Sequence, residues 1–362
     1  MRNRRGREHV ARAKPNQSIT ISGVSVAPGQ RAVIDLEVAQ LYTHTPLSIP
    51  IEVINGAKEG PVLLVNAAIH GDELNGVEAV RQLLGRIDES RLKGTVVAVP
   101  VVNVFGLIHK SRYLPDRRDL NRCFPGSERG SIAGRLAYQF FNQVVKHCNY
   151  VIDLHTGAIH RSNLPQIRAN LSNETTSEIA HAFGTPIIID AVLRDGSLRA
   201  IAEEHSIPVI TYEGGEALRF DPIPIAAAVE GVMRVMRLLG MLRKTRKKSP
   251  ITPVIARSTS WVRAEQNGIL RSQVTLGDRV DKGQVLAFIS DPLGRSEVEV
   301  KAPREGIVIG IQTLPLVNEG DAIVHIAFFY AENRLVQETV ETYIDEVMEQ
   351  AGEELVMSSM LG

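Results

Sequence analysis

Two histidines and a glutamate stand where this chain is best placed to do chemistry. His70 and Glu73 lie three residues apart, directly after the apolar run 62–68. Where a strand turns into a helix, an imidazole and a carboxylate at this spacing can converge on one point. Zn²⁺ accepts nitrogen and carboxylate oxygen ligands, and a catalytic zinc site has about three protein ligands. An H-x-x-E pair alone is more often a helix cap and a surface charge. The pair therefore indicates a metal site only if a third ligand follows.

His155 is the candidate third ligand. It comes after the apolar residues of V-I-D-L-H-T-G, so a second predicted buried strand leads directly to it. Asp153 lies two residues earlier and points the same way in an extended chain, where it can orient an imidazole. Two imidazoles and a carboxylate suit Zn²⁺ and leave one position open for water. We therefore expect one zinc ion per chain, on His70, Glu73 and His155.

A water activated by zinc needs a proton acceptor, and Glu213 is the candidate. It lies in T-Y-E-G-G at the end of the apolar run 208–213, and the glycines allow a close approach of backbone and substrate. A carboxylate there can accept the proton of the water and pass it to a leaving amine. The alternative is a surface glutamate before a turn.

The long polar segment 103–127 carries candidate cationic groups. Arg112 is followed by the string D-L-N-R at 119–122. One guanidinium can bind a carboxylate through two hydrogen bonds, and a second can stabilise a tetrahedral oxyanion. The alternative is a set of solvated arginines. Loops of this length in compact domains are usually functional, which favours a role at the site.

The elements that position these residues alternate between strands and helices. This alternation predicts an α/β fold with a mostly parallel core sheet, in which strand ends share one edge where ligands bind. Residues 19–54 alternate apolar and polar side chains, which predicts antiparallel strands and hence a mixed sheet flanked by helices. Core strands are expected at 62–68, 94–102, 150–154, 186–190 and 208–213, and helices from 74 and at 131–147, 175–183, 197–205 and 222–243.

The composition changes after the basic segment 243–250. Residues 260–330 read as short strands, and L-G-D-R-V-D-K-G-Q-V-L followed by V-K-A-P-R-E-G-I-V resembles the biotinyl/lipoyl-type flattened β-barrel. Carrier domains of that type present a modified lysine at a hairpin tip, but the tip 290–296 contains none. We therefore expect a basic arm at 1–16, a catalytic domain at 17–248, a small all-β barrel domain at 249–330 and an acidic, partly helical tail at 331–362.

The bulk composition excludes several classes of protein. The chain has 362 residues, with 41 basic and 41 acidic side chains, so its zero net charge argues against a general nucleic-acid binder. Cys123 and Cys148 do not form a disulfide framework, which favours a reducing, cytoplasmic compartment. The basic N-terminus has no apolar segment after it, and no run is long enough to span a membrane, so neither a signal peptide nor a membrane partner is expected.

Six motifs in order are shared with one known family. N-x-x-x-H-G-x-E at 66–73, P-x-x-N at 100–103, R-Y at 112–113, D-L-N-R at 119–122, D-L-H-T at 153–156 and Y-E-G-G at 212–215 resemble the succinylglutamate desuccinylase/aspartoacylase family. That family is a branch of the zinc carboxypeptidase-like hydrolases. The resemblance covers 61–243, and the β-rich C-terminal part also fits.

The resemblance implies a role for each matching residue. Zinc would bind His70, Glu73 and His155, and Glu213 would be the general base and acid. The substrate would be a small, anionic N-acyl amino acid, cleaved by attack of zinc-activated water. The segment L-P-D-R-R after Arg112 is longer than in other members of the family. Among the remaining residues, Arg112 would polarise the scissile carbonyl, Asn121 and Arg122 would hold a substrate carboxylate, Asn103 would support substrate binding, and Arg168 would be a further substrate contact.

Three other functions stay open from the residues alone. A carboxypeptidase would use the same metal site. A carrier or adaptor built on the β-barrel is disfavoured by the missing lysine, and a binder without turnover is disfavoured by Glu213. The sequence does not specify the acyl group, the amine or the oligomeric state. A homo-oligomer therefore stays open.

Overall fold

The computed structural model describes residues 14–245, 251–329 and 333–361. Most of the predicted arm at 1–16 therefore lies outside the described residues. The first part of the chain contains the strands β1 (Ile19–Ile21), β2 (Val24–Val26), β3 (Gln30–Gln40), β4 (Pro46–Asn55), β5 (Lys58–Ala67), β6 (Lys93–Val99), β7 (Tyr150–Gly157), β8 (Arg161–Ala169), β9 (Ile187–Asp190) and β10 (Val209–Glu216). Its helices are α1 (Asn75–Arg86), α2 (Val104–His109), α3 (Ile132–Gln143), α4 (Glu174–Phe183), α5 (Leu198–Glu204) and α6 (Pro222–Leu238), with short 3-10 turns at Leu120–Arg122 and Val145–His147.

The central sheet is mixed, as predicted. Strands β6, β5, β7 and β10 are parallel neighbours, which brings their carboxyl ends to one edge. Strands β3 and β4 extend one side of this core as antiparallel neighbours, and β8 extends the other. The predicted α/β class with antiparallel strands at the front is therefore confirmed.

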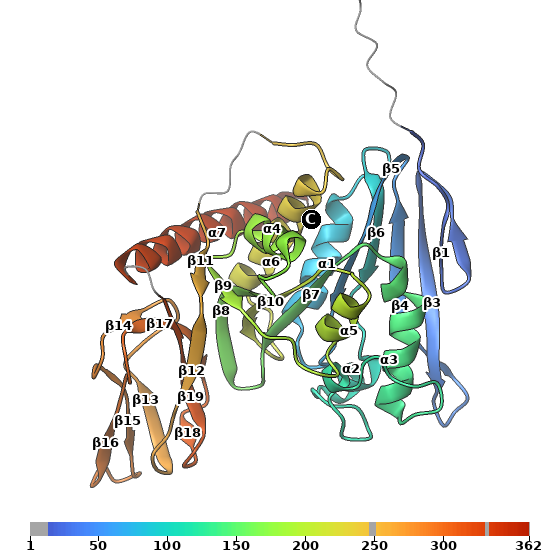
Figure 1. Ribbon diagram of the computed structural model, residues 1–362. Helices are drawn as coiled ribbons and strands as arrows, with labels where there is room; N and C mark the ends of the chain where they lie inside the picture. Colours follow the sequence, from blue (N-terminus) through green and yellow to red (C-terminus); the bar gives the residue numbers. More distant parts are fainter. Residues whose placement is uncertain (1–13, 246–250, 330–332, 362) are drawn as a thin grey trace, which may run out of the picture.

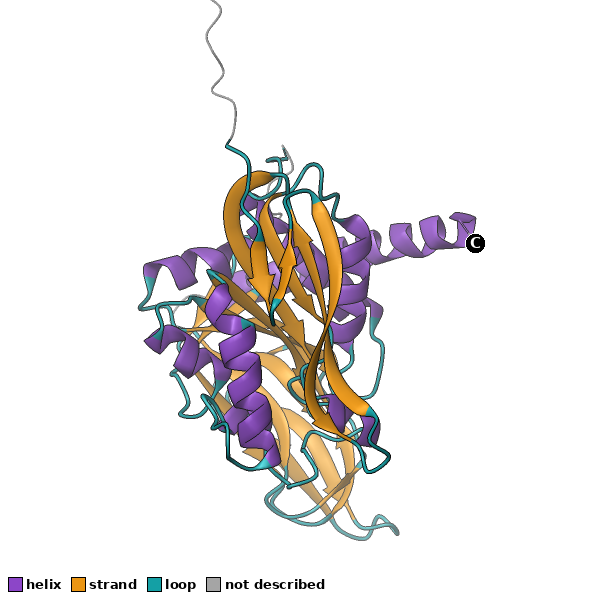
Figure 2. Cartoon of the chain, turned by 90° about the vertical axis from the view of Figure 1, so that its right-hand side faces the viewer, coloured by secondary structure: helices purple, strands orange, loops and turns teal. Residues whose placement is uncertain are grey.

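Helices cover both faces of the sheet because its apolar side chains alternate (Figures 1 and 2). Leu64, Val97 and Val151 point to the face covered by α3 and α5. Their neighbours Leu63 and Ile152 point to the opposite face, which α1, α4 and α6 cover. The buried strands are thus apolar on both sides, as their continuous runs indicated.

The C-terminal part continues the central sheet instead of standing apart from it. Strand β17 (Gly306–Gln312) pairs with β8, and β11 (Val254–Ala256) pairs with β9. Figure 1 shows these strands, in orange to red, beside the strands of the first part of the chain. The other strands are β12 (Ser258–Arg263), β13 (Gly268–Ser272), β14 (Arg279–Val280), β15 (Val285–Ser290), β16 (Glu297–Lys301), β18 (Leu316–Val317) and β19 (Ala322–Phe328).

A small β domain with its own apolar core is present, as predicted. Strands β16, β15, β13 and β18 form a second sheet, whose Leu286 and Ile289 pack in one apolar cluster with Val324 of β19. Its biotinyl/lipoyl type and the proposed domain boundaries stay predictions. The acidic tail forms α7 (Asn333–Leu361), whose end projects beyond the sheet in Figure 2. None of the described helices has the length and apolarity needed to cross a membrane.

Three local predictions differ from the structure. Strand β8 was not predicted, because Pro165 interrupts its pattern. The proline is tolerated because β8 pairs with β17 through residues 161–163 and with β9 only from Gln166 onward. Helix α2 occupies the start of the segment expected to be a loop, and β7 runs on to Gly157, so His155 lies inside this strand.

Candidate metal and substrate site

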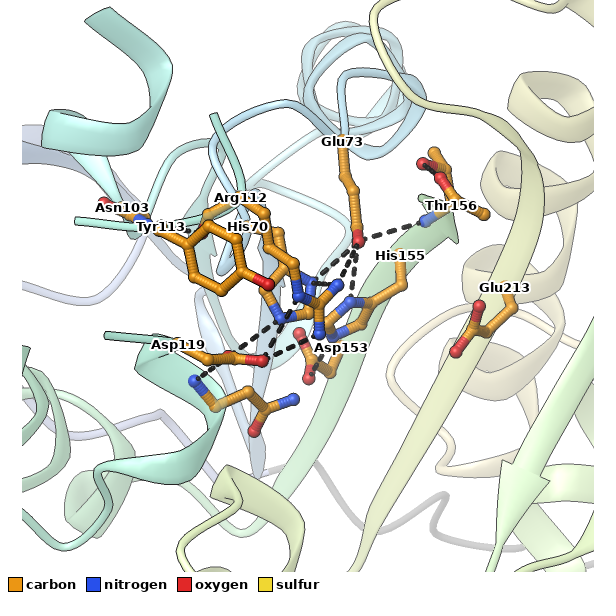
Figure 3. A network of polar contacts seen from close by, with 12 residues as sticks. His70, Glu73, Asn103, Arg112, Tyr113, Asp119, Asp153, His155, Thr156 and Glu213 are labelled. Carbon is orange, nitrogen blue, oxygen red and sulfur yellow. Dashed lines mark hydrogen bonds and ion pairs between the residues drawn. The ribbon is translucent and has the colours of Figure 1, made fainter. Parts of the chain in front are cut away.

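The three predicted metal ligands converge at the carboxyl edge of the sheet. His70 and Glu73 lie between β5 and α1, and His155 lies near the end of β7. Their ligand atoms all lie within 4.8 Å of one another, and the three residues are only 3%, 2% and 4% exposed. The Nδ1 atoms of His70 and His155 lie 2.7 and 2.8 Å from the two carboxylate oxygens of Glu73 (Figure 3).

The opposite nitrogen of each imidazole is held by an aspartate. The Nε2 atom of His155 lies 2.8 Å from Asp153, whose other oxygen accepts a hydrogen bond from Asn66 on β5. The Nε2 atom of His70 lies 3.2 Å from Asp119 of the D-L-N-R string. Such carboxylates fix the ring orientation of metal-binding histidines and leave the Nδ1 atoms to face a common point.

The electrostatics of the three residues fit a cation at this point. Burial raises the pKa of Glu73, but the neighbouring His70 and His155 outweigh it and hold the pKa well below its ordinary value. Burial lowers the pKa of both imidazoles, but the carboxylates beside them shift it upward overall. Two imidazole nitrogens, each with its ring held by an aspartate, and one ionised carboxylate are a donor set that fits Zn²⁺.

Arg112 is held next to this donor set. Its Nε and Nη2 atoms donate to Asp119 at 3.2 and 2.9 Å, and its Nη1 atom lies 3.4 Å from Glu73. Asn103 is fully buried, accepts a hydrogen bond from Gly106 as the cap of α2, and donates to the Arg112 carbonyl at 3.4 Å. Asn103 does not line the cavity, so the geometry favours support of the Arg112 loop over the substrate contact expected from the sequence.

Glu213 stands beside the donor set on the neighbouring strand. It is the register partner of His155 across β10 and β7. Asn163 of β8 donates to its Oε2 atom at 2.8 Å, and Arg168 Nε lies 3.4 Å from its Oε1 atom. Figure 3 shows the Glu213 carboxylate on the strand next to His155. Arg168 therefore holds the candidate base, in addition to lining the same cavity.

Asn121 and Arg122 line the cavity, but their contacts differ from those expected. The Oδ1 atom of Asn121 accepts a hydrogen bond from the Leu198 amide at the start of α5, at 2.9 Å. Arg122 donates to the Asn121 carbonyl, while Asp119, the partner that its own motif offers, is bound to Arg112 and His70. The amide nitrogen of Asn121 and the guanidinium of Arg122 are the groups left for a ligand.

One cavity of about 490 Å³ connects these groups, a size that suits a small molecule. Sequence reasoning missed several of its residues, among them Arg161, Asn163, Arg199 and Trp261. Burial, and then the nearby Arg168 and Arg194, lowers the pKa of Arg199 to about 10, so it stays cationic at neutral pH. No local motif marks these four residues, because tertiary pairing of β8, α5 and β12 with the catalytic strands brings them here.

Comparison with known proteins agrees with this architecture. The model of the succinylglutamate desuccinylase/aspartoacylase catalytic domain matches residues 59–239. An N-alpha-acetyl-L-2,4-diaminobutyric acid deacetylase from Halomonas elongata is 30% identical over 294 residues, which cover 77% of this chain and 85% of the relative.

Solved structures show the same fold. The product-bound ectoine utilization protein EutE (DoeB) from Ruegeria pomeroyi is 23% identical, with a TM-score of 0.76 over 87% of this chain and 99% of that protein. A succinylglutamate desuccinylase/aspartoacylase from Rhodobacter sphaeroides is 24% identical, with a TM-score of 0.74 over 83% of this chain and 96% of that protein.

Together these findings define a deacylase-type hydrolase with a mixed α/β catalytic domain. The chain belongs to the succinylglutamate desuccinylase/aspartoacylase family, as its motifs predicted.

Proposed function

We propose that this protein is a zinc-dependent amidohydrolase that removes the acyl group from a small N-acyl amino acid. The observation that carries the proposal is the convergence of His70, Glu73 and His155 within 4.8 Å, with Glu213 on the adjacent strand. Family membership and the 30% identical deacetylase, whose name specifies an N-acetylated amino acid, support the same chemistry.

Each group has a defined task in this reaction. Zn²⁺ bound by the three ligands would supply Lewis acidity toward the amide carbonyl and the attacking water. Glu213 accepts a proton from the water and then donates it to the nitrogen of the leaving amine. The hydrogen bond from Asn163 and the charge of Arg168 orient the Glu213 carboxylate for this transfer. Arg112, fixed by Asp119, stabilises the negative charge that develops on the carbonyl oxygen.

The carboxylate of the substrate has suitable partners in the same cavity. Arg122 and Arg199 line it and have no carboxylate partner among the described residues. The Arg199 Nη1 atom is buried and has no hydrogen-bond partner among the described residues. A ligand carboxylate would accept a hydrogen bond from it. A small anionic amide therefore fits the cavity better than a neutral one.

The test is a hydrolysis assay on a panel of N-acyl amino acids, with the zinc-loaded protein and its Glu213→Gln variant. Glutamine keeps the shape of Glu213 but cannot accept the proton, so turnover should fall by about 10²–10⁴-fold while zinc content stays unchanged. Asp291→Asn, on the exposed β15–β16 hairpin, serves as the control and should hydrolyse at the wild-type rate. If Glu213→Gln retains turnover within a few-fold, Glu213 is not the base.

A further inference from the structure

A β-bulge directly after Glu213 changes the course of β10. Glu213 is paired with a residue on each neighbouring strand, but Gly214 has no register partner on either β7 or β8. Pairing resumes with a shifted register, at Gly215 toward β8 and at Glu216 toward β7. A bulge leaves a residue outside the ladder and re-aims the side chains beside it. The direction of the Glu213 carboxylate therefore depends on what holds the bulge in place.

The side-chain amide of Asn75 holds this bulge from the side of the candidate metal ligands. Asn75 is the first residue of α1, follows Glu73 closely in the chain, and is only 1% exposed. Its Nδ2 atom donates to the Gly214 carbonyl at 3.2 Å, and its Oδ1 atom accepts a hydrogen bond from the Asp221 amide at 2.9 Å. One side chain thus ties both ends of the segment 214–221 to α1.

A backbone contact ties the same segment to the turn that carries His70 and Glu73. The Leu218 amide donates to the Asp72 carbonyl at 2.7 Å, and Leu218 adopts a φ of +57°. A leucine in this left-handed region is strained, and such a conformation persists only where the surrounding structure determines it. The chain between β10 and α6 is therefore held in one path against the turn.

The space around the Asn75 amide is closely packed. Gly215 has a φ of +76°, and a β-carbon there would overlap the Asn75 amide nitrogen. A β-carbon at Gly214 would overlap the Tyr212 hydroxyl, which donates to the Pro224 carbonyl at 2.8 Å. The two glycines of the Y-E-G-G motif thus let the bulge approach Asn75 closely enough for its hydrogen bond.

We propose that Asn75 is a positioning residue, which acts on catalysis by setting the direction of the Glu213 carboxylate relative to the three candidate metal ligands. This inference rests on the proposed deacylase function, in which Glu213 is the base. Asn163 and Arg168 hold the carboxylate itself from β8, whereas Asn75 holds the backbone that follows it. Asn75 does not line the cavity, so it acts through Glu213 and not on the substrate.

Removal of the Asn75 amide tests the proposal through a split between kcat and KM. Asn75→Ala should lower kcat on the best N-acyl amino acid by about ten- to a hundredfold, since a misplacement of about 1 Å can cost a hundredfold. KM should stay within about threefold, and the zinc content by elemental analysis should not change, because the cavity wall and the three ligands are kept. An unchanged kcat, or a loss of zinc, would overturn the proposal.

A double-mutant cycle shows whether Asn75 acts through Glu213. In the Glu213→Gln background, which has already lost the base, Asn75→Ala should lower the residual kcat by less than about twofold. An equal loss in both backgrounds would indicate general damage to the site and reject the positioning role. Asn75→Asp enters the same cycle and replaces Asn75→Ala if that variant does not fold. Its ionised carboxylate still accepts from Asp221 but cannot donate to Gly214.

Asn55→Ala is the matched control for structural damage. Asn55 is fully buried, and its amide donates to the carbonyls of Gln17 and Val26, so it also ties a neighbouring segment to the central sheet. It lies outside the cavity. Its variant should have a lower urea midpoint but the wild-type kcat. A kcat as low as that of Asn75→Ala would show that loss of any buried amide has this effect, against the proposal.

A crystal structure of Asn75→Ala separates this inference from the proposed function. The Glu213 carboxylate should move away from Asn163, whose Nδ2 atom lies 2.8 Å from it in the wild type. If the carboxylate moves but the wild type hydrolyses no N-acyl amino acid, the deacylase proposal fails and the positioning of Glu213 by Asn75 stands. If the wild type hydrolyses these compounds and the carboxylate keeps its place in the variant, the positioning role is overturned and the deacylase proposal stands.

Discussion

Gly71 lies between the candidate metal ligands His70 and Glu73 and packs against helix α2, so its replacement by alanine tests this arrangement. A β-carbon at Gly71 would lie 1.9 Å from the Gly106 carbonyl carbon and 2.2 Å from the Leu107 nitrogen. Carbon atoms in favourable contact are about 3.5–4.0 Å apart, so one side must move by about 1.5 Å or more. Because both neighbours are backbone atoms, no change of rotamer relieves the clash.

Either movement disturbs the site. If the turn moves, it carries His70 and Glu73 away from His155. If α2 moves, it carries Asn103, which holds the Arg112 loop. Overpacking a closed site typically costs about 1–3 kcal/mol, and functional groups must stay within about 0.5 Å of their working positions. We therefore expect Gly71→Ala to lower the free energy of unfolding by about 3 kcal/mol and to bind zinc much more weakly.

The assays are urea unfolding of the metal-free protein and zinc content after dialysis against a chelator. Gly85→Ala is the matched control, because a β-carbon at this position in α1 meets nothing within 4 Å. Alanine is favoured over glycine in helices, so this variant should gain about 0.5–1 kcal/mol and retain its zinc. A Gly71→Ala protein with the wild-type midpoint and full zinc content would refute the reasoning.

Three further changes have definite expected outcomes. His155→Ala should lose most of its zinc by elemental analysis, and full occupancy would remove His155 from the site. Burial, and then the nearby Arg168 and Arg161, lowers the pKa of His325 to about 3 from an ordinary 6.5, so this imidazole is neutral when folded and the unfolded state binds its proton first as the pH falls. Between pH 7.5 and 5 the wild type should therefore lose about 2 kcal/mol of unfolding free energy, and His325→Asn should not show this loss. Urea unfolding midpoints of both proteins at the two pH values measure the difference. Equal losses in the two proteins would contradict the prediction. Arg122→Lys should raise KM for an N-acyl amino acid.

The sequence was sufficient to predict the core strands and the convergence of the three candidate metal ligands, because both depend on local signals. Continuous apolar runs end at His70, His155 and Glu213, and parallel strands with helical crossovers place such ends at one edge. The contacts of Asn103 and Asn121 could not be predicted in this way. An asparagine side chain satisfies a helix terminus as readily as it binds a ligand, and both residues do so here, at Gly106 and Leu198.

The remaining part of the site depends on pairing between distant segments. Asn163 reaches Glu213 because β8 lies antiparallel to β10, although Pro165 interrupts the strand pattern of β8. Trp261 reaches the cavity because β12, β19 and β17 continue the central sheet beyond β8. Strand order between segments about a hundred residues apart has no local sequence signal, so these residues become visible only in the folded chain.

The Arg122 prediction depends on which residues bind Asp119, the carboxylate of the D-L-N-R motif. Asp119, the carboxylate that could have paired with Arg122, is bound to Arg112 at 2.9 Å and to His70 at 3.2 Å. The guanidinium of Arg122 therefore has only a backbone carbonyl as a hydrogen-bond partner within the described residues. Lysine keeps the charge but cannot make a two-pronged contact, so Arg122→Lys should raise KM about tenfold for an N-acyl amino acid. KM for the corresponding N-acyl amine, which lacks the carboxylate, should change little, and an equal rise for both compounds would make Arg122 a structural residue.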